Sequence, residues 1–253
     1  MTDSESGGKP VLVLLHGWGV NQGVWQQTAN ALADKYTVIT PDLPGFGLAQ
    51  HFPQPYTLPA VVEQLAAQIP DASLVCGWSL GGLLALALAT QYPHKVSRLA
   101  LVAASPCFLA QPDWPGMSHD VLQQFAKALS VNLTQTIERF LAIQAMGSVS
   151  ARADSKILKQ AILAYPAARP EAVSGALTLL SECDLRQSLA GLRQPLAGIF
   201  GRLDSLVPAA VVAHIQQLRP DAQLTLLPHA SHAPFISHPA EFLHWLRDWL
   251  SHS

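Results

Sequence analysis

Residues 73–82 read SLVCGWSLGG and are followed directly by the apolar run LLALALAT at residues 83–90. The run before the first glycine has the composition of a strand buried on both faces, and the run after the last glycine favours a helix. The G-x-S-x-G pattern of Gly77, Ser79 and Gly81 therefore stands at a strand-to-helix junction. In that context the motif holds a serine at the top of a sheet. The stretch predicts an α/β fold with Ser79 as a nucleophile.

The chemistry of a nucleophilic serine explains the spacing of this motif. The serine backbone is strained in so sharp a turn, and flanking glycines let strand and helix approach without a Cβ clash. The same letters also fit a glycine-rich turn without chemistry, and their position at the junction favours the catalytic interpretation. A serine hydroxyl needs a histidine as general base and a carboxylate that orients the histidine. In this fold the three residues follow in the order serine, acid, histidine.

The acid is expected in the loop after a late strand. The apolar run LAGIFG at residues 196–201 is followed by Arg-Leu-Asp, which places Asp204 in such a loop. An aspartate before Ser-Leu-Val-Pro also fits a turn or a helix cap without catalytic function. Asp184 and Asp113 remain as alternatives. We predict Asp204 as the acid.

Two histidines compete for the role of the base, because the loop after the last predicted strand reads PHASHAPF at residues 228–235. His229 directly follows the strand and a proline, whereas His232 lies deeper in the loop. His238 already belongs to the start of the final helix. We predict His232 as the base, with His229 as the alternative.

A tetrahedral intermediate also needs two N–H donors for its oxyanion. One is expected from the residue after the nucleophile, which is Leu80 at a helix N-terminus. The other is expected from the loop after the first core strand, where His-Gly-Trp-Gly occupies residues 16–19. We predict the N–H groups of Trp18 and Leu80 as the oxyanion hole, and His16 as a structural residue beneath that loop.

The rest of the chain continues the alternation of short Val-, Ile- and Leu-rich runs with longer segments of helical period. From about residue 109 to 193 no strand-like run occurs, and prolines and glycines mark both ends of that stretch. We predict an α/β core at 1–108 and 194–253 with a helical cap at 109–193. The predicted strands are Val11–Leu15, Tyr36–Thr40, Ser73–Gly77, Arg98–Ala103, Leu196–Gly201 and Gln223–Leu227, and the predicted core helices are Val24–Asp34, Leu58–Gln68, Leu80–Gln91, Ala209–Leu218 and Ala240–Leu250.

Composition excludes several classes of function. Of the 253 residues 49% are hydrophobic and 13% charged, and the net charge is −2, which offers no basic field for nucleic acid or an anionic membrane. No apolar stretch approaches the length of a membrane span, and the first ten residues lack a secretory signal. Three cysteines without ligand spacing indicate neither a disulfide framework nor a metal site. We expect a cytoplasmic protein without a metal or cofactor.

Several motifs together resemble those of the α/β-hydrolases, a fold with a mostly parallel sheet flanked by helices. The motifs are LLHGWG (14–19), PDLPGFG (41–47), GWSLGG (77–82), GRLDSLVP (201–208) and SHAPFISHPAEF (231–242). More narrowly, the chain resembles the pimeloyl-[acyl-carrier protein] methyl ester esterases. This narrower resemblance depends on Trp18, Trp78 and the last motif, and on the cap segments SPCF (105–108), DWPG (113–116) and IERFLAIQAMG (137–147).

The resemblance implies a serine carboxylesterase that releases methanol from the methyl ester of pimeloyl-carrier protein during biotin biosynthesis, acting as a monomer without a cofactor. Ser79, Asp204 and His232 match the triad of that family. Two alternatives stay open, namely another hydrolase of the same fold, such as a short-chain carboxylesterase, thioesterase, lipase or carbon–carbon hydrolase, and a ligand-binding protein that has lost its chemistry. The implied substrate contacts are Trp18, Ser79, Leu80, Phe140, Leu141, Ala142, Ile143, Gln144 and His232.

Charge in the predicted cap agrees with an acidic carrier protein as a transient partner. Residues 121–160 carry five Lys and Arg side chains against two acidic ones, in a chain whose net charge is −2. Arg152, Lys156 and Lys159 are spaced four and three residues apart, which places them on one face of a helix. Together with Arg139 they form the predicted docking surface. A solvated helix face without a partner is the alternative.

Overall fold

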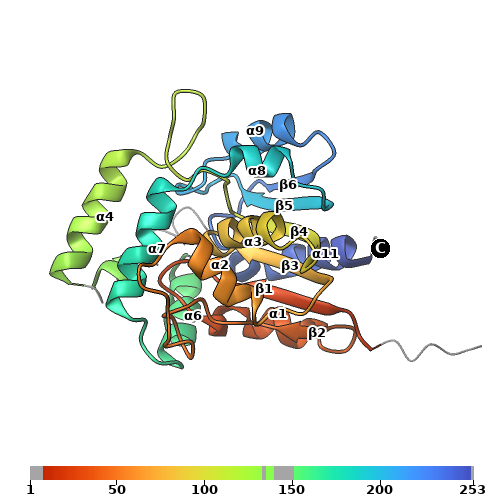
Figure 1. Ribbon diagram of the computed structural model, residues 1–253, viewed down its shortest axis with the longest axis horizontal. Coiled ribbons are helices and arrows are strands. Elements are labelled where there is room, and N and C mark those ends of the chain that lie inside the picture. Colours follow the sequence, from red (N-terminus) through yellow and green to blue (C-terminus); the bar gives the residue numbers. More distant parts are fainter. Residues whose placement is uncertain (1–7, 133–134, 140–150, 252–253) are drawn as a thin grey trace, which may run out of the picture.

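Six parallel strands form one sheet in the computed structural model, which describes residues 8–132, 135–139 and 151–251 (Figure 1). The strand order is β2-β1-β3-β4-β5-β6, so the chain starts at β1, adds β2 on one side and then adds β3 to β6 in sequence on the other side. Neighbouring strands are parallel throughout. The strands are β1 (Val11–Leu15), β2 (Thr37–Ile39), β3 (Ser73–Trp78), β4 (Val96–Val102), β5 (Leu196–Gly201) and β6 (Gln223–Leu227).

Both faces of the central strands are buried, which explains why their sequences are continuous apolar runs. Along β1, Val13 and Leu15 join one hydrophobic cluster, whereas Leu12 and Leu14 join a second cluster on the opposite face. The first cluster includes side chains of α2 (Leu58–Ala66), α3 (Leu80–Gln91), α8 (Arg186–Ala190) and α9 (Ala210–Leu218). The second includes side chains of the 3₁₀ helix η1 (Gln22–Trp25), α1 (Gln26–Leu32), α10 (Pro234–Ser237) and α11 (Pro239–Ser251).

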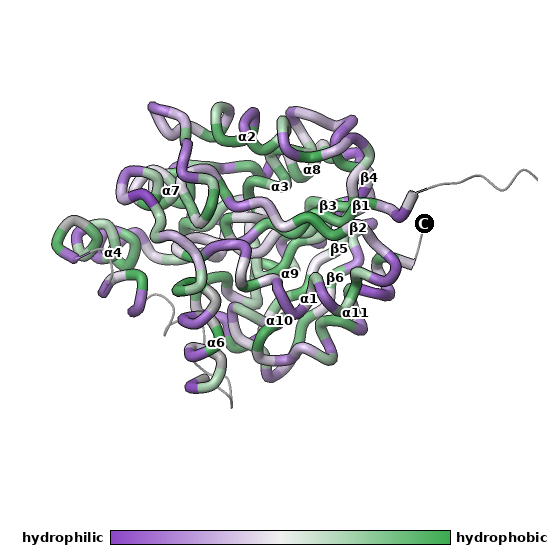
Figure 2. Tube along the Cα trace, turned by 90° about the horizontal axis from the view of Figure 1, so that it is seen from below, coloured by the Kyte–Doolittle hydropathy of each residue, from purple (hydrophilic) through white to green (hydrophobic). Residues whose placement is uncertain are grey.

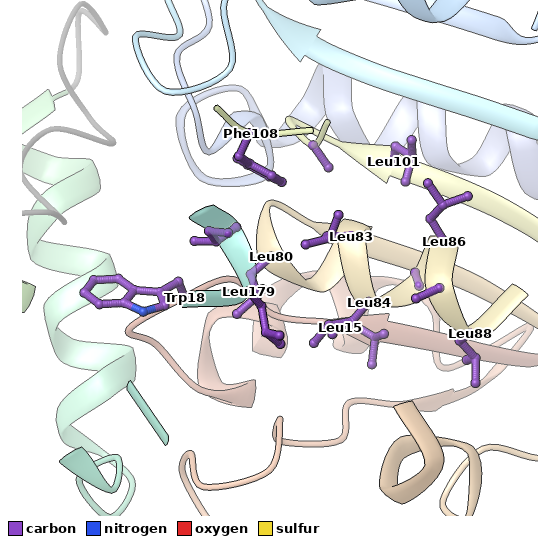
Figure 3. Close-up of a cluster of buried hydrophobic side chains, with 14 of the residues drawn as sticks. Leu15, Trp18, Leu80, Leu83, Leu84, Leu86, Leu88, Leu101, Phe108 and Leu179 are labelled. Atoms are coloured by element: carbon purple, nitrogen blue, oxygen red, sulfur yellow. The ribbon is translucent and has the colours of Figure 1, made fainter. Parts of the chain in front are cut away.

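Helix α3 is buried along almost its whole length. Every residue from Leu80 to Ala89 is buried, and the helix appears as one of the green segments beside the strands in Figure 2. Figure 3 shows its leucines beside Leu15 and Leu101 from the sheet, with Trp18 at one end of the cluster. A helix that is apolar on all sides is typical of a protein interior. The strand-to-helix turn at Ser79 is thus anchored on both sides by packed elements.

Between β4 and β5, the regular secondary structure of the described residues is helical. The helices are α4 (His119–Val131), a short helical segment at 135–139, α6 (Ala151–Leu163), α7 (Pro170–Glu182) and α8. In Figures 1 and 2, α4, α6 and α7 lie together on one side of the sheet. Among the described residues of this stretch, β-structure is limited to isolated bridges such as Cys107 with Asp184. The division of the chain into a core and a cap at 109–193 stays a prediction.

Apart from shifts of a few residues in the bounds of strands and helices, the structure differs from the sequence-based expectation in one predicted helix and in two short helices. The predicted helix Val24–Asp34 is instead the 3₁₀ helix η1 followed by α1, because Asn21 caps η1 with its side chain, which accepts a hydrogen bond from the N–H of Gly23 at 3.0 Å. Helices α8 and α10 were not predicted. Each spans less than two turns, too short for a helical period to stand out.

The described part of the chain contains no helix that is both long and apolar enough to cross a membrane.

Candidate active site

Ser79 stands in the turn between β3 and α3 with a strained backbone, at φ 54° and ψ −120°. A residue other than glycine rarely adopts a positive φ, and such strain is typical of functional turns. A Cβ atom at Gly77 would overlap the backbone of Gly81, and one at Gly81 would lie 2.5 Å from the carbonyl oxygen of His16. The glycines of the motif are therefore required by the close approach of strand, helix and the first loop.

The three predicted triad residues meet at this turn. The Oγ of Ser79 lies 2.9 Å from Nε2 of His232, and Nδ1 of His232 lies 2.7 Å from Oδ2 of Asp204. All three residues are buried, with exposed fractions of 4% for Ser79, 6% for Asp204 and 1% for His232. Since a carboxylate accepts, Nδ1 donates its proton to Asp204, and Nε2 is left to accept the proton of Ser79. This is the geometry in which an imidazole activates a serine hydroxyl.

Backbone groups fix Asp204 in this arrangement. Its second oxygen, Oδ1, accepts hydrogen bonds from the N–H groups of Leu206 at 2.8 Å and Val207 at 3.0 Å. The loop after β5 thus satisfies one carboxylate oxygen and leaves the other for His232. The two interpretations of Asp204 from the sequence, as a turn residue and as the partner of the histidine, therefore describe the same conformation.

The alternative acids and the alternative base do not take part in this hydrogen-bonded arrangement. Asp113 and Asp184 both form ion pairs with Arg186, at 3.0 Å and 2.7 Å, and neither contacts His232. His229 is exposed to solvent, in contrast to His232. Among the residues weighed for the triad, the structure therefore brings together Ser79, Asp204 and His232. Their catalytic roles stay predictions.

The turn that carries Trp18 packs against the nucleophile. A Cβ atom at Gly17 would lie 3.3 Å from the Cβ of Ser79. The N–H of Leu43 donates to Nε2 of His16 at 3.0 Å, so the ring proton of neutral His16 resides on Nδ1, which donates to the carbonyl oxygen of Gly17 at 2.8 Å. That carbonyl belongs to the same peptide as the N–H of Trp18. Because a trans peptide points its two polar groups in opposite directions, His16 holds the Trp18 N–H facing away from itself.

Leu80 is the first residue of α3, so its N–H is among those that a helix leaves without an intrahelical acceptor. The side chains of Trp18 and Leu80 are buried, with exposed fractions of 1% and 0%. The indole Nε1 of Trp18 donates to the carbonyl oxygen of Val173 in α7 at 2.9 Å. The first loop is therefore attached to α7 through Trp18. The predicted roles of both residues in an oxyanion hole rest on their backbone groups.

Asp42 is a residue whose importance the sequence analysis missed, since the PDLPGFG stretch indicated only a turn. Its buried carboxylate accepts from the backbone N–H of Gln22 at 2.6 Å and of Leu48 at 2.7 Å. Burial alone would raise the pKa of Asp42, but the hydrogen bonds from these two backbone N–H groups stabilise the carboxylate and hold the pKa below its usual value. Asp42 thereby joins the turn at Gly47 to the start of η1.

An apolar cavity of about 190 Å³ lies between the first loop and the helical stretch. It is lined on one side by Gly19 and Val20 and on the other by Ile137 and the carboxyl-terminal end of α6, where Lys159 and Ile162 contribute. No member of the triad is among its described lining residues. The predicted substrate contacts Phe140, Leu141, Ala142, Ile143 and Gln144 lie outside the residues that the structure describes.

The predicted docking residues Arg139, Arg152, Lys156 and Lys159 are all exposed. Lys159 is not free, because its Nζ lies 2.7 Å from the carboxylate of Glu138. The sequence spacing along one helix could not reveal this pair, which joins α6 to the segment at 135–139. Lys159 therefore brings less uncompensated charge to the surface than the spacing suggested.

Within the described ranges, no cluster of three or more His, Cys, Asp or Glu side chains is placed to hold a metal ion.

The chain resembles known hydrolases over most of its length. Residues 10–239 match the family model of the α/β hydrolase fold. The chain is 47% identical over 239 residues to the pimeloyl-[acyl-carrier protein] methyl ester esterase of Pseudoalteromonas atlantica, covering 94% of this chain and 93% of the relative. It is 45% identical over 231 residues to the protein of the same name from Klebsiella pneumoniae, covering 91% and 90%.

Solved structures that resemble this one share its fold at low sequence identity. An esterase from Exiguobacterium antarcticum superposes with a TM-score of 0.87 at 20% identity, covering 96% of this chain and 92% of the esterase. The enol-lactonase from Burkholderia xenovorans superposes with a TM-score of 0.83 at 20% identity, covering 98% and 94%. At this identity the likeness shows the arrangement of strands and helices, and it says nothing of the substrate.

Proposed function

Because the chain belongs to the α/β-hydrolase fold family and, within it, to the family of pimeloyl-[acyl-carrier protein] methyl ester esterases, we propose that it hydrolyses the methyl ester of pimeloyl-carrier protein to the free carboxylate and methanol. The observation that carries the proposal is the continuous hydrogen-bonded chain from Ser79 through His232 to Asp204, with distances of 2.9 Å and 2.7 Å. The reaction belongs to biotin biosynthesis, as the sequence analysis predicts.

In the first half of the reaction, Ser79 Oγ attacks the carbonyl carbon of the methyl ester while His232 Nε2 takes the hydroxyl proton. The negative charge that develops on the carbonyl oxygen is stabilised by the N–H groups of Trp18 and Leu80. When the tetrahedral intermediate collapses, the bond to the methoxy oxygen breaks and His232 returns the proton to that oxygen. Methanol leaves, and the acyl group stays on Ser79.

In the second half, a water molecule attacks the carbonyl carbon of the acyl-enzyme, and His232 takes a proton from this water. The bond to Ser79 Oγ then breaks, and that oxygen recovers its proton from His232. Asp204 keeps the imidazole in the correct tautomer and stabilises its charged form in both halves. The product is the free carboxylic acid on the carrier protein, and the enzyme returns to its starting state.

The proposed partner is an acidic acyl-carrier protein that docks transiently on Arg139, Arg152, Lys156 and Lys159. These side chains are exposed and lie in a part of the chain with an excess of positive charge. Since Lys159 is paired with Glu138, we assign most of the attraction to the other residues of the surface. We further propose a monomer that acts in the cytoplasm.

The experiment that tests the proposed activity offers the purified protein the methyl ester of pimeloyl-carrier protein and measures methanol and the free acid. We expect equal amounts of both products, and we expect the chain to restore growth of a biotin auxotroph that lacks this esterase step. Cleavage of the thioester instead, with release of the carrier thiol, would indicate a thioesterase. Binding of the ester without turnover would indicate a binding protein.

Reversal of charge on the docking surface should slow only the carrier-bound substrate. We expect R152E/K156E to lower kcat/KM for the carrier-bound ester by about tenfold at low salt, and to leave a small free ester unaffected. The effect should shrink as salt rises, because exposed charges are screened over about 10 Å at 0.1 M ionic strength and act mainly on association. The matched control is K35E/R193E, which changes the net charge by the same amount at two exposed positions outside the docking surface, one just before β2 and one shortly before β5.

Two outcomes of this comparison would contradict the docking surface. If both substrates slow equally, the substitutions have damaged the fold of the cap. If K35E/R193E slows the carrier-bound ester as much as R152E/K156E, only the net charge of the protein matters and the surface carries no recognition.

A further inference from the structure

Trp78 occupies the variable position directly before the nucleophile in the Gly77-to-Gly81 motif, and the mechanism above does not use it. It is the last residue of β3 and is fully buried. Its indole Nε1 donates a hydrogen bond to the backbone carbonyl oxygen of His232 at 2.8 Å, across 154 positions of sequence. The residue before the nucleophile is therefore hydrogen-bonded to the backbone of the predicted base.

We propose that Trp78 is a positioning residue that holds the general base at the correct distance from the nucleophile, by fixing the backbone of His232. The inference rests on the proposed function, since His232 acts as a base only if the triad operates. Trp78 touches neither the substrate nor the reacting atoms in this scheme. It acts through its hydrogen bond to the His232 carbonyl, which fixes the position of the His232 backbone.

The loop that carries His232 runs from β6 to the short helix α10, and this histidine is 99% buried. A buried carbonyl without a hydrogen bond carries a large desolvation cost, so the indole N–H favours the conformation that places the carbonyl beside it. Trp78 precedes Ser79 directly at the end of a central strand. The hydrogen bond from its indole N–H to the His232 carbonyl therefore fixes the backbone of the base relative to the backbone of the nucleophile.

The indole ring is itself held firmly. Its centroid lies 5.7 Å from the His232 ring and 4.9 Å from the Phe235 ring, which it meets edge to face. Phe235 in turn stacks on Trp25 at 4.2 Å. Trp78, Phe235 and Trp25 belong to the second hydrophobic cluster, so the hydrogen bond starts from a packed donor with little freedom to move.

The structure offers a matched control in Trp25. It is also fully buried, belongs to the same cluster and contacts the same Phe235 ring, but its Nε1 has no hydrogen-bond partner among the described residues. W25F and W78F therefore remove similar volume from one cluster, and only W78F removes a hydrogen bond. Both variants should lose stability from the cavity.

The test compares W78F and W25F on a small p-nitrophenyl ester, with the full chain and with thermal unfolding measured for each variant. We expect W78F to lower kcat about ten- to hundredfold with KM changed less than threefold, since small misplacement of a catalytic group costs rate rather than binding. We expect W25F to retain kcat within about threefold. In the proton NMR spectrum, the downfield signal of the His232 Nδ1 proton should broaden or shift in W78F and persist in W25F.

A second substitution keeps the shape of the side chain. Site-specific 3-benzothienylalanine at position 78 replaces the N–H by sulfur in the same ring system, so it removes the hydrogen bond without opening a cavity. We expect it to reproduce the kcat loss of W78F with a smaller loss of stability, which reflects the lost hydrogen bond alone. If this variant retains wild-type kcat, or if W78F and W25F lose kcat equally, Trp78 has only a packing role. If the wild-type protein hydrolyses neither the small ester nor the carrier-bound ester, the proposed function itself fails, which is a separate result.

Discussion

Ser79→Ala should lower kcat on the order of 10⁶-fold and abolish labelling by a fluorophosphonate, which should modify the wild-type protein once, at Ser79. The expected loss is large because the serine oxygen forms the acyl-enzyme and no other group at the site can replace it. The hydroxyl is 2.9 Å from His232, and its backbone is strained at φ 54°, so it is the one side chain that the turn presents to the base. Intact-mass measurement and peptide mapping after labelling identify the modified residue.

The matched control is Ser231→Ala, which removes a second buried serine hydroxyl next to His232 in sequence. We expect this variant to label at Ser79 and to retain most activity. Labelling of the S79A variant at any serine, or a kcat within tenfold of wild type, would overturn the assignment of the nucleophile.

His232→Ala should be nearly as damaging as Ser79→Ala, because members of a triad act as a unit and removing the base leaves the hydroxyl protonated. The imidazole bridges Ser79 and Asp204 at 2.9 Å and 2.7 Å, and a water molecule in its place cannot keep both contacts in line. Steady-state kinetics on a small ester measure the effect without the complication of carrier docking. Labelling of Ser79 should slow in parallel.

His229→Ala serves as the control, since it removes the other histidine of the same loop three residues earlier. His229 is exposed, and we expect this variant to keep most of its activity. Equal losses from the two substitutions would mean that the loop as a whole has been disturbed, and the base would then have to be sought elsewhere.

The sequence alone predicts the sheet well, and the reason lies in burial. Runs such as Val11–Leu15 and Leu196–Gly201 are apolar without interruption because both faces of a central strand meet hydrophobic clusters, and the structure has these strands with the predicted bounds. Strand Thr37–Ile39 is shorter than the predicted Tyr36–Thr40. It lies at the edge of the sheet and is only partly buried.

The sequence also predicts the turn at Ser79, because most of what the turn needs is local. The strand, the strained serine and the glycines that permit close approach occupy ten consecutive residues. Asp204 and His232 could be proposed from chain order and from their loops, but composition could not exclude Asp113, Asp184 or His229. The ion pairs of Arg186 with both aspartates and the exposure of His229 are properties of the folded chain.

Only the tertiary structure decides which polar groups become partners. Asp42 joins two loops, Lys159 pairs with Glu138, and Trp78 donates to the carbonyl of His232. Hydrophobic period and turn chemistry are local signals that a few neighbouring residues carry. A hydrogen bond or an ion pair between distant residues leaves no such local signal, since it depends on how the packed elements orient two side chains. Sequence therefore determined the strands and the nucleophile turn, whereas the fold determined how base, acid and oxyanion loop are held around it.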